Sequence, residues 1–199
     1  MNATLRTVLI VAGLALAGFA AYTAGRLLAP PPEPVGTALS DPIDVSGLQL
    51  QAVGNREVTL GDYSNSNKVT AVFFGYTRCP DVCPLTMARI ADTYRTLGEP
   101  DGLSVVMVTV DPGFDTPEVT QEYASVFHED FIGLSGSNQQ IAEAAAAFYV
   151  GFNDIGTEVV HTDALMLLDS QGRFRMLYTT DRLSALTGDL QTILASSDW

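Results

Sequence analysis

The apolar positions of this chain fall into two patterns, which predict alternating strands and helices. Continuous apolar runs predict buried strands at residues 69–76 and 103–110. Helical spacing of apolar residues marks further segments at 85–97, 116–127, 141–149 and 184–194. Short runs on either side of a turn predict hairpins, one from 48–53 with 57–60 and one from 164–169 with 174–178. Strands separated by helices, closed by a hairpin and a helix, indicate an α/β sandwich of thioredoxin type.

The N-terminal segment has a different pattern, because no residue from Thr7 to Gly25 is charged. This run is long enough to cross the hydrocarbon core of a bilayer as a helix. A cleaved signal peptide is the alternative, but small residues at the cleavage positions occur only weakly, at Gly18-Phe19-Ala20. We expect residues 1–28 to be an uncleaved, single-pass anchor. Arg6 and the amine indicate a cytoplasmic N-terminus in a bacterial inner membrane, with the remaining chain in the periplasm.

The rest of the chain reads as a linker and one domain. Residues 29–42 are rich in proline and predict a stiff spacer. Residues 43–199 are enough for a single thioredoxin-like domain, which we expect to be monomeric. The formal net charge is −13, and Lys68 is the only lysine. We therefore do not expect nucleic acid or anionic lipid surfaces as partners of this domain.

The candidate chemistry lies in the only two cysteines, Cys79 and Cys83, which directly follow the apolar run at 69–76. At the junction between a strand and a helix, the helix N-terminus favours the thiolate form. A thiolate is both the nucleophile of disulfide exchange and a soft metal ligand. A purely structural disulfide closing so short a loop would stabilise the fold by only about 2 kcal/mol. Redox chemistry and metal binding are thus the two candidates.

The spacing of the pair argues against two familiar thiol enzymes. Thioredoxin-type reductases have two residues between the cysteines and a cis-proline before a later strand, whereas this chain has three, and its last proline is Pro117. A peroxiredoxin-type thiol would need a threonine three residues before the cysteine, and Thr77 lies two before it. A metal site needs a third ligand, for which His161 is the candidate, since two thiolates and an imidazole suit Cu(I) and also allow Cu(II). The other histidine, His128, is expected to be solvated beside Glu129 and Asp130.

Several motifs together resemble the Sco/SenC family of membrane-anchored, thioredoxin-fold copper chaperones. They are GYTRCPDVCP at 75–84, VDP at 110–112, DTP at 115–117, FIGLSG at 131–136 and HT at 161–162. The resemblance implies that Cys79, Cys83 and His161 bind one copper ion. It also implies delivery to the dinuclear copper centre of cytochrome c oxidase, with the copper-accepting subunit of the oxidase as a partner.

The chain departs from the family pattern at two places. An acidic residue often precedes the histidine, where this chain has Val160, and Arg or Glu often fills the positions of Gly113 and Phe114. The first departure puts in doubt the group that orients the imidazole of His161, since metal-bound histidines usually have such a partner. The second alters a loop that faces partners. Neither removes a ligand.

Other residues near these motifs have simpler explanations. Asp111 and Asp115 are expected to form a turn and a helix cap rather than to steady the site. The apolar settings of four methionines predict core packing rather than copper ligation: Met87, Met107, Met166 and Met176. Tyr76 and Arg78 flank the pair and are expected to shape access to it.

We therefore expect a metallochaperone rather than an enzyme. Because only thiolates bind copper, the Cys79–Cys83 disulfide must first be reduced, which requires a thioredoxin-like reductase as a second partner. The alternative is a thiol-disulfide oxidoreductase or redox sensor in which Cys79 and Cys83 form a redox-active disulfide.

Overall fold

The computed structural model describes residues 2–28, 33–65, 67–154, 159–161, 163–197 and 199. These residues form two units, Met1–Glu33 and Pro34–Trp199. The first unit is the helix α1 (Ala3–Leu28), whose described apolar side chains, such as Leu14 and Phe19, are exposed. Over the described residues, no helix meets both the length and the apolarity required to cross a membrane.

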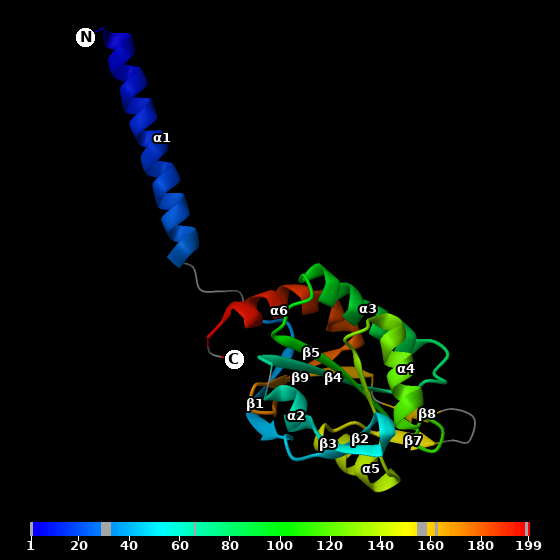
Figure 1. Ribbon diagram of the computed structural model, residues 1–199. Coiled ribbons are helices and arrows are strands. Elements are labelled where there is room, and N and C mark those ends of the chain that lie inside the picture. The colour runs from blue at the N-terminus through cyan, green and yellow to red at the C-terminus, as the bar shows by residue number, and fades with distance from the viewer. Residues whose placement is uncertain (1, 29–32, 66, 155–158, 162, 198) are drawn as a thin grey trace. The chain divides into compact units, whose positions relative to one another are not determined.

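The second unit is built on a six-stranded sheet in the order β1-β10-β9-β4-β5-β6 (Figure 1). Its strands are β1 (Thr37–Asp44), β4 (Val69–Gly75), β5 (Leu103–Thr109), β6 (Ile132–Leu134), β9 (Ala164–Asp169) and β10 (Arg173–Thr179). The pairs β4–β5 and β5–β6 are parallel, whereas β9 is antiparallel to β4 and to β10. Phe73 is in register with Met107 on one side and Leu165 on the other.

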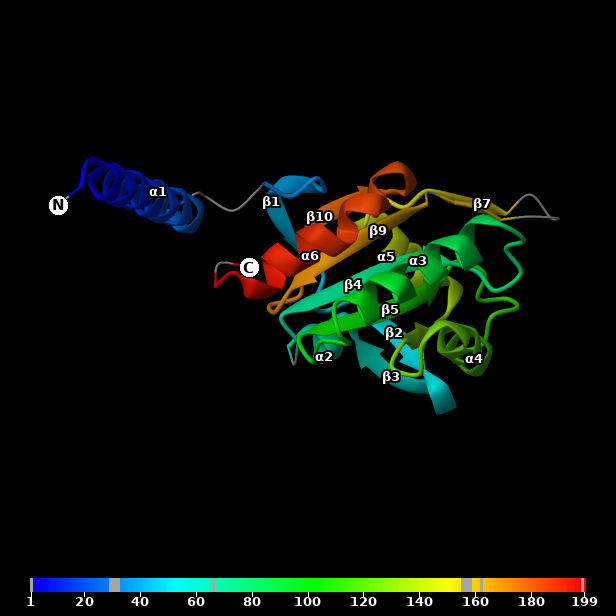
Figure 2. The ribbon, with the colours of Figure 1, turned by 90° about the horizontal axis from the view of Figure 1, so that it is seen from above.

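Layers on both faces of the sheet explain the continuous apolar runs of its central strands. The helices α3 (Val82–Thr96) and α6 (Leu186–Ala195) lie side by side over one face (Figure 2). The other face carries the hairpin of β2 (Gln49–Ala52) and β3 (Arg56–Thr59), together with α2 (Leu60–Ser64) and α5 (Asn138–Ala147). Every residue of β4, β5 and β9 is buried, as expected for strands covered on both faces.

The helix α4 (Pro117–Phe127) packs along the edge strand β6. Thr116 caps it, accepting a hydrogen bond from the amide of Val119, and Pro117 occupies the first turn, as predicted. The close packing depends on Gly133 of β6, where a Cβ atom would lie 2.3 Å from the backbone oxygen of Thr120. The remaining elements are the 3₁₀ segments η1 (Val53–Asn55) and η2 (Thr180–Ala185) and the small hairpin of β7 (Phe152–Asp154) and β8 (Val159–His161).

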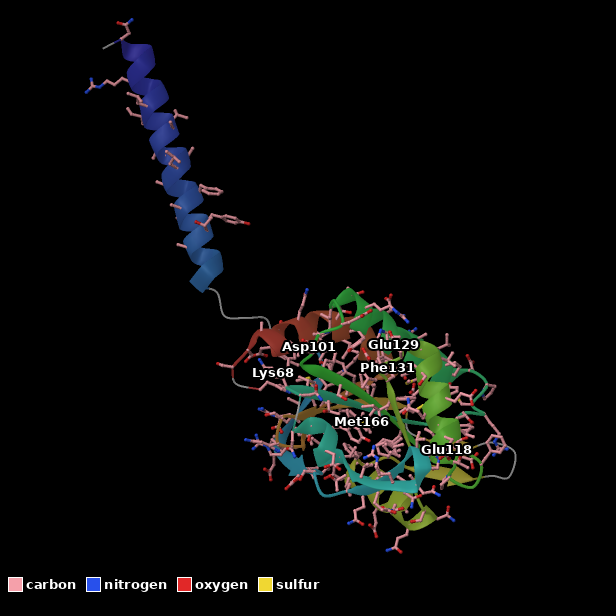
Figure 3. All side chains as sticks on the ribbon, viewed as in Figure 1. Lys68, Asp101, Glu118, Glu129, Phe131 and Met166 are labelled. Carbon is pink, nitrogen blue, oxygen red and sulfur yellow. The ribbon has the colours of Figure 1, made fainter. Side chains whose placement is uncertain are left out.

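The predicted α/β sandwich and its core are confirmed. Figure 3 shows side chains gathered between the layers, with Phe131 and Met166 in the interior, where they are 1% and 0% exposed. The methionines predicted to pack in the core are all buried: Met87, Met107, Met166 and Met176.

The first strand of the second unit lies within the proline-rich N-terminal part of that unit. Regular structure begins at Thr37, inside the range assigned to the linker, rather than at Ile43. The reason lies far away in the sequence, because the buried carboxylate of Asp189 in α6 accepts hydrogen bonds from the amides of Val35 at 2.7 Å and Gly36 at 3.0 Å. β1 is a partly exposed edge strand, and its sequence lacks the alternation of apolar and polar residues that identifies a strand. The short strands β6, β7 and β8 were not predicted from the sequence, because they lack the same alternation.

Candidate metal centre

The two cysteines occupy different environments at the start of α3. The helix begins at Val82, three residues before the predicted start, so Cys83 lies inside its first turn. Cys79 is partly exposed in the preceding loop, whereas Cys83 is completely buried. Gly75, at the end of β4, leaves room for the buried sulfur, since a Cβ atom there would lie 3.2 Å from Cys83 Sγ. The glycine thus lets the strand approach the cysteine closely.

The sulfurs of the pair lie close together. Both residues are present as thiols, and the amide of Cys83 donates a hydrogen bond to Cys79 Sγ at 3.4 Å. This amide belongs to the first turn of α3, where unpaired N–H groups favour a negative sulfur. Burial raises the pKa of the Cys83 thiol, and the hydrogen bond with the Cys79 thiol and the charge of Asp163 raise it further. Cys79 is therefore the accessible member of the pair, and Cys83 is the buried one.

The cysteine loop is held by the buried carboxylate of Asp115. Its Oδ2 accepts hydrogen bonds from the amide of Thr77 at 2.9 Å and from Oγ1 of Thr109 at 2.7 Å, and Oδ1 accepts one from Oγ1 of Thr77. Asp115 is 0% exposed. The expectation that it serves only a turn or a cap is wrong, because Thr116 caps α4 and the Asp115 side chain points to the loop two residues before Cys79. Asp115 therefore steadies the site.

A second contact covers the outer side of the same loop. The guanidinium of Arg78 forms a salt bridge with Asp111 at 2.6 Å and lies over the ring of Phe114, 4.4 Å from its centroid. Phe114 is one of the positions at which the chain departs from the motif pattern. Its ring forms a cation–π contact with the arginine that precedes Cys79. Both side chains are more than half exposed. They form part of the rim of the site.

Asp163, which the sequence analysis missed, faces the same helix from the start of β9. Its Oδ1 accepts a hydrogen bond from Oγ1 of Thr86, one turn after Cys83, at 3.5 Å, and its Oδ2 accepts one from Thr180. The position of Asp163 two residues after His161 was the available signal. The contact with Thr86 brings the chain that enters β9 against the first turns of α3.

The structure describes the backbone of the predicted third ligand, His161, but not its side chain. His161 ends β8, where it pairs with Phe152 of β7, and its side chain and all of Thr162 lie outside the described part of the chain. Within the described residues, no three His, Cys, Asp or Glu side chains are grouped to hold a metal ion. The ligand set of Cys79, Cys83 and His161 therefore stays a prediction.

The expectation that His128 is solvated is wrong. Its side chain is 9% exposed and packs against Tyr94 and Phe131, with ring centroids at 4.8 Å and 5.4 Å. Its Nε2 lies 3.3 Å from a carboxylate oxygen of Glu99. The two aromatic rings that cover it come from α3 and from the segment before β6, which the local sequence does not reveal.

Comparison with known proteins decides the family. The model of the SCO1/SenC family matches residues 46–195, most of the second unit. The chain belongs to the SCO1/SenC family. This confirms the resemblance carried by the cysteine segment and the later motifs.

Related proteins agree with this assignment. The solution structure of apo Sco1 from Thermus thermophilus is 34% identical, with a TM-score of 0.69, and the match covers 79% of this chain and 95% of that one. The structure of Bradyrhizobium japonicum ScoI with copper bound is 31% identical, with a TM-score of 0.63 and coverage of 78% and 99%. An SCO2-like protein of Rickettsia prowazekii is 32% identical over 61% of this chain, and the match spans 65% of that relative's length.

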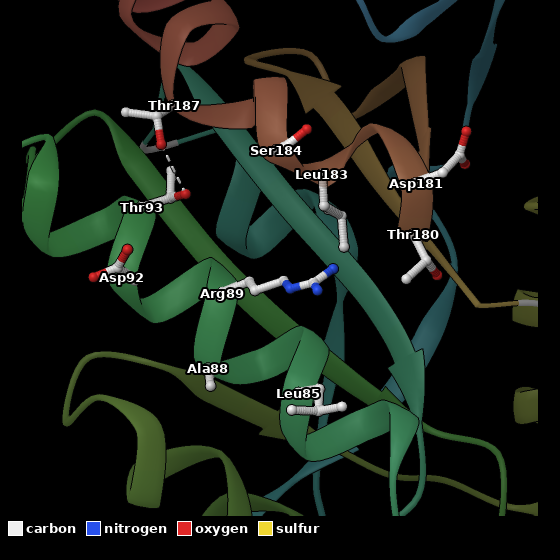
Figure 4. A pocket seen from close by; sticks show the side chains of 10 residues that line it. All are labelled: Leu85, Ala88, Arg89, Asp92, Thr93, Thr180, Asp181, Leu183, Ser184 and Thr187. Atoms are coloured by element: carbon white, nitrogen blue, oxygen red, sulfur yellow. Dashed lines mark hydrogen bonds between the residues drawn. The ribbon is translucent and has the colours of Figure 1, made fainter.

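A groove of about 650 Å³ runs beside the cysteine helix of this SCO1/SenC protein (Figure 4). It separates α3 from η2 and the start of α6, and the side chain of Arg89 extends into it from α3. At the cysteine end, Leu85 is 56% exposed, and Val82 is also exposed. Apolar side chains therefore reach solvent next to Cys83.

The network around Asp115 gives a stability prediction. We expect Asp115→Ala to lower the free energy of unfolding by about 3 kcal/mol or more, because the buried donors of Thr77 and Thr109 lose their acceptor. The matched control is Asp111→Ala, which removes a salt bridge to an exposed arginine and should cost less than about 1 kcal/mol. Urea denaturation of both variants measures the difference. Equal losses would show that the Asp115 carboxylate does not hold the cysteine loop.

Proposed function

We propose that this protein is a copper chaperone. It binds one copper ion through Cys79, Cys83 and His161 and delivers it to the dinuclear copper centre of cytochrome c oxidase. The observation that carries the proposal is the pair of neighbouring sulfurs, one buried and one accessible, at the N-terminus of α3. Membership of the SCO1/SenC family and the copper-bound structure of the Bradyrhizobium japonicum relative support it.

The donor set suits Cu(I) as cargo. Thiolate sulfur is a soft ligand, and an imidazole completes a near-trigonal site in which Cu(II) is also accessible. Cys83 lies in the core and stays in place, whereas Cys79 is reached from solvent. A thiolate of the receiving protein can thus approach the metal on the Cys79 side and take it by ligand exchange. Cys83 is then the last ligand from which the metal dissociates.

Chain geometry supports His161 as the third ligand. Asp163 contacts Thr86 in α3, one turn after Cys83. His161 lies two residues before Asp163, and two residues of chain span at most about 7 Å. The antiparallel pairing with Phe152 fixes the backbone of β8 up to His161. These contacts support His161 as the third ligand.

The same pair supports a second candidate function, that of a thiol-disulfide oxidoreductase or redox sensor. An accessible sulfur that accepts a helix N–H group, followed by a buried thiol, is an arrangement in which Cys79 attacks and Cys83 resolves. The chaperone function needs a thioredoxin-like reductase as a second partner, since copper binds only the reduced pair. Copper stoichiometry separates the two functions.

An anaerobic Cu(I) titration of the reduced protein against a competing chelator tests the proposal. We expect one tight equivalent, which Cys79→Ser and Cys83→Ser each abolish because Cu(I) loses a thiolate. His161→Ala should weaken binding about tenfold or more, since the site loses its imidazole. His128→Ala is the matched control and should leave the affinity unchanged, because that ring packs against Tyr94 and Phe131.

The titration also has a contradicting outcome. Weak binding that is indifferent to His161→Ala would remove the chaperone assignment and favour the oxidoreductase. An intact oxidase copper centre in cells carrying both cysteines as serine would contradict both functions.

We propose further that α1 anchors the protein in the bacterial inner membrane, with the second unit in the periplasm. The support is the uncharged run from Thr7 to Gly25 and the exposed apolar side chains of α1. We expect alkaline carbonate to leave the full chain in the membrane fraction and to release a chain that begins at Glu33. Leu14→Arg should reduce membrane retention, because a central arginine costs about 3 kcal/mol on insertion. Release of the full wild-type chain by carbonate would contradict the anchor.

A further inference from the structure

The carboxylate of Asp163 joins the two elements that flank the cysteine end of the groove. Its Oδ1 accepts a hydrogen bond from Oγ1 of Thr86 in α3 at 3.5 Å, and its Oδ2 accepts one from Oγ1 of Thr180 in η2. Thr86 is 1% exposed, so its hydroxyl needs an acceptor inside the protein, and the carboxylate provides one. One side chain thus links α3, η2 and the residue that leads into β9.

Side chains bridge the groove between α3 and the segment of η2 and α6 at both of its ends. At the end away from the cysteines, the hydroxyls of Thr93 and Thr187 form a hydrogen bond at 3.0 Å (Figure 4). At the cysteine end, the bridge runs from Thr86 through Asp163. Both bridges bind α3 through a threonine hydroxyl, but only the second includes the chain that leads away from His161.

The backbone of His161 is restrained on both sides. His161 ends β8 and pairs with Phe152 of β7, so the hairpin restrains the chain up to the histidine. Asp163 follows two residues later, a separation of at most about 7 Å along the chain. Its hydrogen bonds to α3 and η2 restrain the chain after the histidine. If Asp163 lost these bonds, the hairpin alone would hold this part of the chain.

We propose that Asp163 is a positioning residue for His161, because its carboxylate fastens the chain after the histidine to the helix that carries Cys83. Metal-binding histidines depend on neighbouring groups that fix their orientation, and loss of such groups weakens metal binding. Asp163 acts on the position of the His161 backbone and is not itself a copper ligand. This inference rests on the proposed function, in which His161 is the third ligand of the copper ion.

The deciding test is a double-mutant cycle between Asp163 and His161, measured by anaerobic Cu(I) titration of the reduced protein. We expect Asp163→Ala to weaken Cu(I) binding roughly threefold to tenfold, because the imidazole loses its fixed position. In the His161→Ala background the same change should have no effect, because the group that Asp163 positions is gone. Equal losses in both backgrounds would overturn the proposal, since the effect would then not pass through His161.

Two further variants separate positioning from charge and from a general loosening of α3. Asp163→Asn has the same shape and can still form hydrogen bonds with both threonines, so it should restore most of the affinity that Asp163→Ala loses. Thr187→Val is the matched control. It breaks the hydrogen bond to Thr93 at the far end of the groove and should leave the affinity unchanged. An Asp163→Asn variant as weak as Asp163→Ala, or an equal loss in Thr187→Val, would overturn the proposal.

Amide hydrogen exchange of the copper-free protein distinguishes failure of this inference from failure of the proposed function. We expect Asp163→Ala to speed exchange over residues 159–161 roughly fivefold or more, because this segment loses its anchor. Thr187→Val should leave that exchange unchanged. If wild-type protein binds Cu(I) equally well without His161, the proposed ligand set fails, and faster exchange in Asp163→Ala still supports the anchoring. Unchanged exchange in Asp163→Ala would overturn the inference.

Discussion

The buried carboxylate of Asp115 joins the three segments on which the site depends. It accepts hydrogen bonds from Thr77 in the cysteine loop and from Thr109 at the end of β5, and its own backbone leads into α4. A buried carboxylate is costly unless its oxygens accept hydrogen bonds. If the loop moved away, this carboxylate would be exposed to solvent or would lose its hydrogen bonds. The carboxylate thus fixes where Cys79 and the first turn of α3 lie relative to the sheet.

With the loop fixed, the two sulfurs differ in environment although they are four positions apart. Cys83 is enclosed by the strand end at Gly75 and lies in the core, while Cys79 lies in the rim formed by Arg78 and Phe114. Burial favours the neutral thiol at Cys83, and Cys79 Sγ accepts a hydrogen bond from the amide of Cys83. The pair is therefore suited to chemistry that begins at the exposed sulfur, whether copper transfer or disulfide exchange.

The sequence predicted the elements whose signals are local. The buried strands, the amphipathic helices and the cysteine segment each have a pattern that can be read within about ten residues. The missed features depend on distant partners: β1 is fixed by Asp189, and Asp115 is committed to Thr77, 38 positions earlier. His128 was placed in solvent because its neighbours in sequence are acidic, whereas Tyr94 and Phe131 bury it. Such long-range contacts produce no periodic pattern in the sequence.

We propose that a single copper ion is held by the two sulfurs and one imidazole. X-ray absorption spectroscopy of the Cu(I)-loaded protein tests it most directly, since sulfur and nitrogen ligands are counted in the same measurement. We expect two sulfur ligands and one imidazole nitrogen per copper, with the imidazole signal lost in His161→Ala and kept in His128→Ala. Three or more sulfur ligands per copper, or an imidazole signal that survives His161→Ala, would contradict it.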